Sequence, residues 1–347
     1  MTMARTVPLI ALLSLAGCAT TATRPAISPA PTASVQAKGE TQAVGTANAD
    51  AADDPAIWRN PADPAASLIV GTDKKAGLYV YDLEGRQRFF IDAGRVNNVD
   101  LRDMGAAGII VAASDRNDPR NAKLALFRLD PASASLVPLG KLAVGPGEAY
   151  GICLYREGDV LFAFNVIKDG TIRQVALSLG DAPRASIVRT MKLATQSEGC
   201  TVDERTHRLY VAEEDMGLWR FDARPGGDTA PVRMAAADGY RIVADTEGVA
   251  IAPEGDGDGG YLLVSSQGDN AYAVFRLSDD SYVGRFRVTA GAVGSTEETD
   301  GIDFAMGDFG TAYPGGLLVV QDGRNMPRAQ NFKLVDWASI KAALGIR

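Results

Sequence analysis

Short hydrophobic segments recur along this chain of 347 residues, and many of them begin beside a glycine. The clearest is Thr246-Glu247-Gly248-Val249-Ala250-Ile251, in which polar residues and a glycine precede a hydrophobic run. Comparable segments occupy residues 53–58, 97–102, 149–154, 197–202 and 299–304. Successive copies are spaced by roughly 50 residues, a period typical of β-propellers and similar closed repeat folds. The pattern therefore predicts six copies of one structural unit.

Each copy continues with further segments of expected β-strand. A second run of aliphatic residues, such as Leu317-Leu318-Val319-Val320, has the composition of a strand buried on both faces. A third run alternates, and a more polar fourth run follows in five copies. The sixth copy ends in a short expected helix at 337–344, so residues near 35–44 should supply its missing strand. The sequence predicts an all-β fold, a six-bladed β-propeller of four-stranded antiparallel blades whose ring is closed by an N-terminal strand.

The N-terminal segment has the features of an export signal and is set apart from the fold. Arg5 precedes a hydrophobic run at 7–15 that is far too short for a membrane-spanning helix of ~20 residues. The run ends in Leu15-Ala16-Gly17-Cys18, which resembles a bacterial lipobox, in which residues 1–17 would be removed and Cys18 would carry lipid. An ordinary cleaved signal peptide with an incidental cysteine is the alternative.

Residues 18–35 are rich in Ala, Thr, Pro and Ser, a composition that predicts a disordered tether. The propeller domain is then expected to span residues 36–347. Ala19 follows the cysteine where Asp would retain a lipoprotein at the inner membrane, which favours sorting to the outer membrane. We therefore expect an exported monomer, either an outer-membrane lipoprotein or a periplasmic or extracellular protein. The lipid on Cys18 would be its only membrane contact.

Composition argues against several kinds of site. Acidic residues outnumber basic ones by 43 to 35 and the formal net charge is −8, so no broad basic surface for nucleic acid is expected. With one histidine and three cysteines, the chain is poorly equipped for a zinc site or a histidine-based triad. Cys153 and Cys200 lie in adjacent repeats, but alignment of the repeat glycines gives them opposite strand parity. A disulfide and a pair of buried free thiols both remain open.

Chain connectivity predicts where the polar residues of the repeats meet. In an up-and-down blade, the start of the first strand and the end of the second strand lie at the same rim of the ring. Each copy has polar residues at both places, so one face of the ring should collect them. Acidic residues dominate this set: Asp53, Asp54, Glu198, Glu214, Asp245, Glu247, Asp300 and Asp303.

Carboxylates at this density would repel one another unless cations neutralise them. Oxygen ligands of this kind favour Ca²⁺ or Mg²⁺ over zinc, and Ca²⁺ accepts irregular sites. A solvated acidic rim without bound metal is the alternative. Basic residues share the rim, namely Lys74, Lys75, Arg116 and Lys168. Acids that hold metal beside clustered cations suit a phosphate ester, because the cations bind phosphates and a bound metal lowers the pKa of an attacking water.

The rim motifs together resemble those of the β-propeller phytases. They stand at 53–58, 71–78, 97–100, 150–151, 197–199, 212–215, 245–248, 265–268 and 299–303. The likeness extends in order through every copy, from about Ala49 to Trp337. It implies a six-bladed, calcium-dependent phosphatase, usually a 3-phytase, which hydrolyses phytate (myo-inositol hexakisphosphate). It also implies adjacent cleavage and affinity sites for phosphate, and additional structural calcium ions.

The resemblance also assigns roles to individual positions. The implied ligands of the catalytic calcium ions are Asp54, Glu198, Glu214, Asp245, Glu247 and Asp303, with Asp53 and Asp300 as further candidates. The implied phosphate-binding residues are Lys74, Lys75, Arg116, Tyr150, Lys168 and Asp169, although the family often has Glu at the last position. Lys74, Arg116, Tyr150, Lys168 and Glu198 form the expected catalytic set. Asp322 and Asn325 would belong to a structural calcium site, which Arg324 alters by standing where the family commonly has an acid.

Two other functions remain open from the sequence. A calcium-dependent lactonase of propeller fold also places acids around a metal in the channel, but it does not need the basic residues of the rim. A non-catalytic propeller at the cell surface would bind complexes of calcium and phosphate without turnover. The departures at Asp169 and Arg324 keep this last interpretation open.

Overall fold

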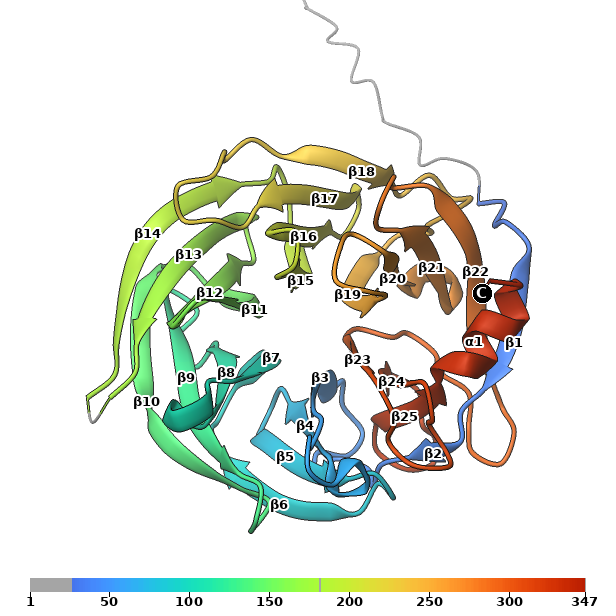
Figure 1. The fold of residues 1–347 in the computed structure, drawn as a ribbon, viewed down its shortest axis with the longest axis horizontal. Coiled ribbons are helices and arrows are strands. Elements are labelled where there is room, and N and C mark those ends of the chain that lie inside the picture. The colour runs from blue at the N-terminus through green and yellow to red at the C-terminus, as the bar shows by residue number, and fades with distance from the viewer. Residues whose placement is uncertain (1–26, 181, 347) are drawn as a thin grey trace, which may run out of the picture.

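Six β-sheets surround a central axis in the computed structural model, which describes residues 27–180 and 182–346 (Figure 1). Each sheet is one blade, and its strands follow one another outward from the axis. The predicted six-bladed β-propeller is confirmed. Within the described ranges, no helix is both long and apolar enough to cross a membrane. The expected signal peptide and the tether as far as residue 26 lie outside the described residues.

The first three blades are built from consecutive strands. Blade 1 contains β3 (Ala52–Trp58), β4 (Leu68–Asp73), β5 (Gly77–Asp82) and β6 (Gln87–Asp92). Blade 2 contains β7 (Val96–Asp103), β8 (Ile109–Asp115), β9 (Asn121–Asp130) and β10 (Ser135–Pro146). Blade 3 contains β11 (Ala149–Glu157), β12 (Val160–Ile167), β13 (Thr171–Ser178) and β14 (Arg184–Lys192). Short 3₁₀ turns, η1 (Pro64–Ala66) and η2 (Gly105–Ala107), precede the second strands of blades 1 and 2.

The last three blades include the N-terminal segment. Blade 4 contains β15 (Ser197–Asp203), β16 (Arg208–Glu213), β17 (Gly217–Asp222) and β18 (Val232–Ala236). Blade 5 contains β19 (Thr246–Pro253), β20 (Gly260–Ser266), β21 (Ala271–Arg276), β22 (Tyr282–Thr289) and β1 (Thr32–Gln36). Blade 6 contains β23 (Ile302–Met306), β24 (Gly316–Asp322), β25 (Asn331–Asp336) and β2 (Gly39–Glu40). The turn η3 (Gln267–Asp269) links β20 to β21, and helix α1 (Trp337–Leu344) follows β25.

The N-terminal segment closes the ring in two places. Strand β2 pairs antiparallel with β25 and completes blade 6, as expected for residues near 35–44. Strand β1 pairs in parallel with β22 and adds a fifth strand to blade 5, which the sequence analysis did not predict. The expected tether therefore ends too late at residue 35, because Thr32 already pairs with Arg285. Closure of both outer edges by the same segment leaves fewer unpaired strand edges.

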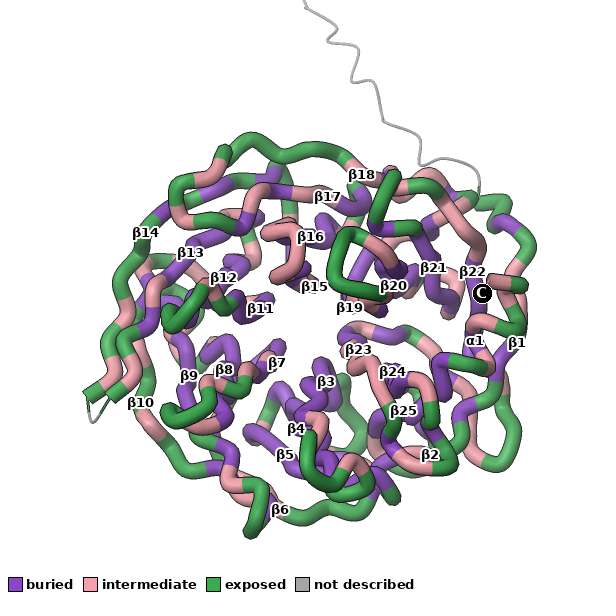
Figure 2. The backbone as a smooth tube through the Cα atoms, viewed as in Figure 1, coloured by how far each residue is buried: buried purple, intermediate pink, exposed green. Residues whose placement is uncertain are grey.

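The hydrophobic core lies between neighbouring blades rather than at the centre of the ring. Figure 2 shows buried backbone in the inner and middle strands and exposed backbone at the periphery. At the interface of blades 1 and 2, for example, Val70 and Val80 pack with Val111 and Ala125. Strand β4 is buried along its whole length because both of its faces contact a neighbouring blade or strand. The second hydrophobic run of each repeat follows from this two-sided burial.

The repeat glycines allow the inner strands to approach one another around the axis. A Cβ atom on Gly151 would lie 1.9 Å from the carbonyl oxygen of Glu198, and one on Gly199 would lie 2.4 Å from that of Glu247. No side chain is compatible with such approaches, because the obstacle is backbone of the next blade. Gly151, Gly199 and Gly248 thus pack against the acidic residue that precedes the next glycine, and Gly301 packs against Asp53 and Asp54. The same glycine contacts therefore bring the inner strands close together and place the acidic residues of neighbouring blades next to one another.

Cys153 on β11 and Cys200 on β15 form a disulfide between blades 3 and 4, with their Cα atoms 5.7 Å apart. Their opposite parity, which left the bond open in the sequence, is what brings them together. Neighbouring blades pack front face against back face, so a side chain on the front of one blade meets a side chain on the back of the next. Both cysteines contribute to the hydrophobic cluster at that interface.

Candidate active site

The polar ends of the strands meet at one rim of the ring, as the connectivity predicts. Ala52 at the start of β3 pairs with Asp73 at the end of β4, and Ser197 likewise pairs with Glu213 in blade 4. The opposite rim carries the other strand ends. Between the rims, all six inner strands line a cavity of about 320 Å³. The candidate site occupies the rim at which the first strand of each blade starts and the second strand ends.

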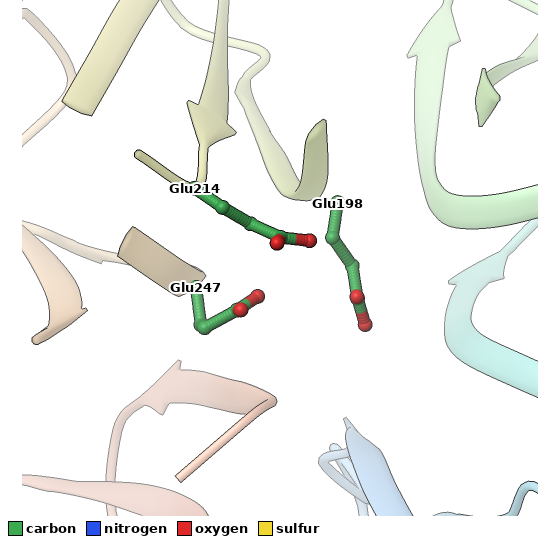
Figure 3. Close-up of side chains that lie close together, drawn as sticks. All are labelled: Glu198, Glu214 and Glu247. Atoms are coloured by element: carbon green, nitrogen blue, oxygen red, sulfur yellow. The ribbon is translucent and has the colours of Figure 1, made fainter. Parts of the chain in front are cut away.

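Three glutamates form the centre of the site. Glu198 on β15, Glu214 just after β16, and Glu247 on β19 each offer a carboxylate oxygen, and these oxygens lie within 4.8 Å of one another. Figure 3 shows the three side chains extending from separate strands toward a common space. Glu198 and Glu247 are buried, and Glu214 is half-buried. The sequence predicted all three as metal ligands, and the fold brings them together.

A second group of acids surrounds Lys74 beside the glutamates. The Lys74 ammonium lies 2.8 Å from Asp300, 2.9 Å from Asp53 and 2.9 Å from Asp50. Burial alone would lower the pKa of Lys74, but the neighbouring carboxylates outweigh this effect and raise it. Asp53 is almost fully buried; its Oδ1 contacts the Lys74 ammonium, whereas its Oδ2 has no hydrogen-bond donor among the described residues. One ammonium therefore balances only part of the negative charge here.

Electrostatics connects the two groups into a single cluster. Burial and the nearby charge of Asp53 raise the pKa of Glu198 well above its usual value. Burial, together with repulsion from Glu198, does the same to Glu247. Burial, partly offset by Lys74, raises the pKa of Asp300 to about 8. These groups resist ionisation because the charged forms are desolvated and repel one another. A bound cation would reverse both effects.

Asp245 belongs to the same cluster. Its charge raises the pKa values of Glu214 and Glu247, after the larger contribution of burial to each. Gln267, in the turn η3, donates a hydrogen bond from its backbone N to the carbonyl oxygen of Asp245, at 3.0 Å. Its side-chain amide donates to Asp300 at 2.6 Å. Gln267 thus joins the acids of blades 5 and 6.

A cationic clamp borders the glutamates on the side of blades 2 and 3. The guanidinium carbon of Arg116 lies 5.2 Å from the centroid of the Tyr150 ring, and Lys168 Nζ lies 4.9 Å from it. Arg116 also donates to Asn97 and Glu148, and Asn97 in turn donates to Glu198 at 2.7 Å. Burial, followed by the charge of Glu198, raises the pKa of Tyr150, which stays a neutral phenol. The predicted phosphate-binding residues therefore converge next to the predicted metal ligands.

Two expected substrate-binding residues lie at the margin of the clamp. Lys75 is exposed at the rim beside Lys74. Asp169 is exposed as well, and its carboxylate accepts a hydrogen bond from the backbone N of Thr171 and pairs with Lys192 at 3.3 Å. Lys192 belongs to β14, the outer strand of blade 3. These contacts direct Asp169 toward its own blade and give no support to a substrate-binding role.

Asp54 and Asp303 lie deeper in the channel than the rim cluster. Asp54 accepts from the backbone N of Val99 at 3.1 Å, and Asp303 accepts from that of Ile57 at 2.8 Å, which links three inner strands. Both residues line the channel cavity. Burial raises the pKa of Asp54 well above its usual value and that of Asp303 to about 7, with repulsion from Asp100 adding to the latter. The expected ligands therefore fall at two depths, one at the rim and one, with Asp54 and Asp303, inside the channel.

Asp322 and Asn325, the expected ligands of a structural calcium ion, lie outside the cluster and contact a lysine. The fully buried ammonium of Lys333 contacts Asp322 at 2.9 Å, Asn325 at 3.2 Å and Glu40 of β2 at 2.7 Å. It also donates to Asn331 at 2.8 Å. A lysine side chain therefore supplies the positive charge that these oxygens need. It also ties the N-terminal strand to blade 6.

Several residues of the site were not assigned from the sequence. Asn97, Glu148 and Gln196 position Arg116, Tyr150, Glu198 or Glu214 through hydrogen bonds, and Asp50 and Gln267 contact the acids around Lys74. Asp50, Glu148 and Gln196 precede the first strand of a blade, Gln267 follows the second, and Asn97 is the second residue of β7, so all five lie at the rim. No role was assigned to them because amides and single acids at loop ends are common surface residues.

Comparison with known proteins agrees with this geometry. The sequence model of the phytase family matches residues 2–347. The chain belongs to the phytase family. A 3-phytase of Bacillus subtilis (strain 168) is 38% identical to it over 331 residues, which cover 90% of this chain and 85% of that protein. The match spans all six blades of this phytase-family chain, so the resemblance inferred from the rim motifs is confirmed.

Proposed function

We propose that the protein is a calcium-dependent 3-phytase that hydrolyses phytate to lower inositol phosphates and phosphate. The observation that carries the proposal is that two arrangements lie side by side at one rim, joined through Asn97 and Gln196. One is a buried carboxylate cluster with more negative charge than its lysine balances. The other is a clamp of Arg116, Tyr150 and Lys168. The first suits a divalent metal, and the second suits the phosphates of a highly anionic substrate.

The residues present fit calcium better than other metals. The ligand atoms on offer are all oxygens, and the three glutamates come from blades 4 and 5, so the site is irregular. Ca²⁺ accepts six to eight oxygen ligands in such sites, whereas Mg²⁺ needs a tight octahedron. Among the described residues, no donor hydrogen-bonds to Glu247 Oε2 or to Asp53 Oδ2. Buried oxygens of this kind are what a cation would engage.

The chain's own groups would bind and orient the ester. Arg116 and Lys168 hold peripheral phosphates, with Tyr150 fixing the distance between the two cations. Calcium, when bound, supplies a Lewis acid that neutralises phosphate charge and lowers the pKa of a water. In the hydrolysis, a water oxygen would form a bond to phosphorus as the bond to the inositol oxygen breaks, with Arg116 and Lys168 holding the phosphates in place. The inositol oxygen leaves with a proton that derives ultimately from water.

The clamp argues against the lactonase alternative, because a neutral lactone has no use for two cations stacked on an aromatic ring. A binding propeller without turnover predicts that phytate is bound tightly but that no phosphate is released. Both alternatives are decided by assaying phosphate release and lactone hydrolysis on the same preparation. Hydrolysis of phytate without hydrolysis of the lactone supports the proposal.

The decisive experiment measures phosphate release from phytate with calcium-stripped protein and after calcium is returned. Activity should vanish on stripping and recover on addition, and metal-independent release would refute the proposal. Glu198→Gln removes one carboxylate charge from the cluster and should abolish activity with the fold retained. Glu204→Gln is the matched control, since Glu204 pairs with Arg102 at 2.9 Å and lines the channel cavity toward the opposite rim. It should leave calcium dependence unchanged.

Export and lipidation are part of the proposal. They rest on the hydrophobic segment and the Leu15-Ala16-Gly17-Cys18 motif, because residues 1–26 lie outside those described. A protein at the outer membrane would meet phytate outside the cytoplasm and release phosphate for uptake. Incorporation of labelled palmitate into the wild type, and its loss in Cys18→Ala, would support an anchor. A cleaved but unlabelled protein would instead indicate an ordinary signal peptide.

A further inference from the structure

Arg285 on β22 is a buried charged residue that the proposed reaction does not use. Its side chain is fully buried, and it forms an ion pair with both carboxylate oxygens of Asp269 at 2.6 Å. A second guanidinium nitrogen donates to the backbone carbonyl of Tyr240 at 3.0 Å. Burying a guanidinium costs much desolvation, which these contacts offset, although its Nε has no hydrogen-bond partner among the described residues. The question is what these contacts hold in place.

The contacts of Arg285 join two segments of the rim. Asp269 belongs to the turn η3, whereas Tyr240 belongs to the segment 237–245 between blades 4 and 5. Ser266 connects the same two segments, because its hydroxyl donates to Asp269 and accepts from the backbone N of Val243, both at 2.8 Å. Arg285, Asp269 and Ser266 thus form one buried polar network beneath both segments.

The two segments also touch each other directly above this network. A Cβ atom on Gly268 would lie 1.9 Å from the carbonyl oxygen of Ala244, so the turn packs closely on that backbone. Gln267 donates its backbone N–H to Asp245 and its side-chain amide to Asp300. The network is therefore separated from the carboxylate cluster only by the turn and the segment that carry Gln267 and Asp245.

We infer that Arg285 is a positioning residue for the candidate calcium site, acting through Asp269 to fix where Asp245 and Gln267 stand. The inference rests on the proposed calcium dependence. A planar guanidinium places one nitrogen on the Asp269 carboxylate and a second on the Tyr240 carbonyl at a fixed separation, whereas an ammonium has no such fixed geometry. Loss of this geometry lets the turn move relative to Asp245. Because metal sites depend on partners that orient their ligands, calcium affinity should register the change.

The test is a calcium titration of the full-length protein by isothermal calorimetry, together with steady-state assays on phytate. Arg285→Lys keeps the charge, and Asp269→Asn breaks the same pair from the turn with little change of volume. Both should weaken calcium binding about 10–100-fold, the range found for residues that orient metal ligands. At saturating calcium, kcat should recover, and KM for phytate should stay near the wild-type value because the clamp lies on blades 2 and 3.

Arg205→Met is the matched control. Arg205 pairs with both carboxylate oxygens of Asp203 at 2.9 Å and donates to the carbonyls of Gly255 and Gly259, at the opposite ends of the strands. Its loss should lower the melting temperature with calcium affinity unchanged. Wild-type affinity in folded Arg285→Lys and Asp269→Asn overturns the inference, and so does equal weakening in Arg205→Met. A wild type that neither binds nor needs calcium defeats the proposed function, and the inference with it.

Discussion

The disulfide between Cys153 and Cys200 gives a prediction whose size follows from the structure. The bond closes a loop of 47 residues and ties blade 3 to blade 4 beside the candidate site. In the chain-entropy treatment, a loop of this length restricts the unfolded chain by about 4 kcal/mol at 25 °C. For a domain of roughly 320 residues, the unfolding entropy is about 0.7 kcal/mol per degree, so the bond should raise the melting temperature by about 6 °C.

The assay is calorimetric unfolding of Cys200→Ala against the wild type in saturating calcium. This variant keeps the buried Cys153 and its packing, so it isolates the bond better than the double replacement does. Loss of the bond should also change the positions of Tyr150 and Glu198 in the candidate site, because these residues lie three and two positions before the bonded cysteines. A melting temperature within 1 °C of the wild type would refute the reasoning. It would show that the bond does not stabilise the fold by restricting the unfolded chain.

Three further changes test the site and its surroundings. Lys74→Ala should lower kcat/KM for phytate about 10–100-fold, since a hydrogen bond from a charged group contributes about 1.5–3 kcal/mol. An unchanged value in steady-state assays would rule out a role for Lys74 in phosphate binding. Lys333→Met should lower the free energy of unfolding by about 3–5 kcal/mol in denaturant titrations, because it leaves Asp322 as a buried charge without its lysine. Lys38→Met, at a half-exposed pair, should lower it by less than 1 kcal/mol. In calcium-stripped protein, burial raises the pKa of Asp300 to about 8, against roughly 4 when unfolded. The native state then binds the proton more tightly, so melting temperatures of stripped protein should fall from pH 5 to pH 8, and saturating calcium should flatten that slope.

Much of the architecture follows from local rules that the sequence displays. The spacing of the glycine motifs predicts the number of blades. The second run of each copy, which is hydrophobic at consecutive positions, identifies a strand buried on both faces. Because consecutive strands in a blade are antiparallel, chain order alone assigns each polar strand end to one rim. Glu198, Glu214 and Glu247 were placed together by this rule, although some fifty residues separate the first from the last.

Chain order does not predict how deep in the channel a side chain lies, or which residue it meets across the interface between two blades. It does not distinguish the rim position of Asp300 from the deeper position of Asp303, because both belong to one motif. Nor does it show that Asp169 pairs within its own blade. These outcomes depend on side-chain direction and on β-bulges near the strand starts, which shift the register by one residue.

The sequence by itself determined the repeat, the strand types and the rim on which the acids gather, since each depends on residues close together in the chain. Only the tertiary structure decided which partners meet across blades. It joined Cys153 to Cys200 by stacking opposite faces, and it placed Lys333 among oxygens that a metal was expected to hold. It also set Arg285 beneath the turn that carries Gln267. Contacts between distant residues depend on how whole sheets pack, and no local pattern encodes that geometry.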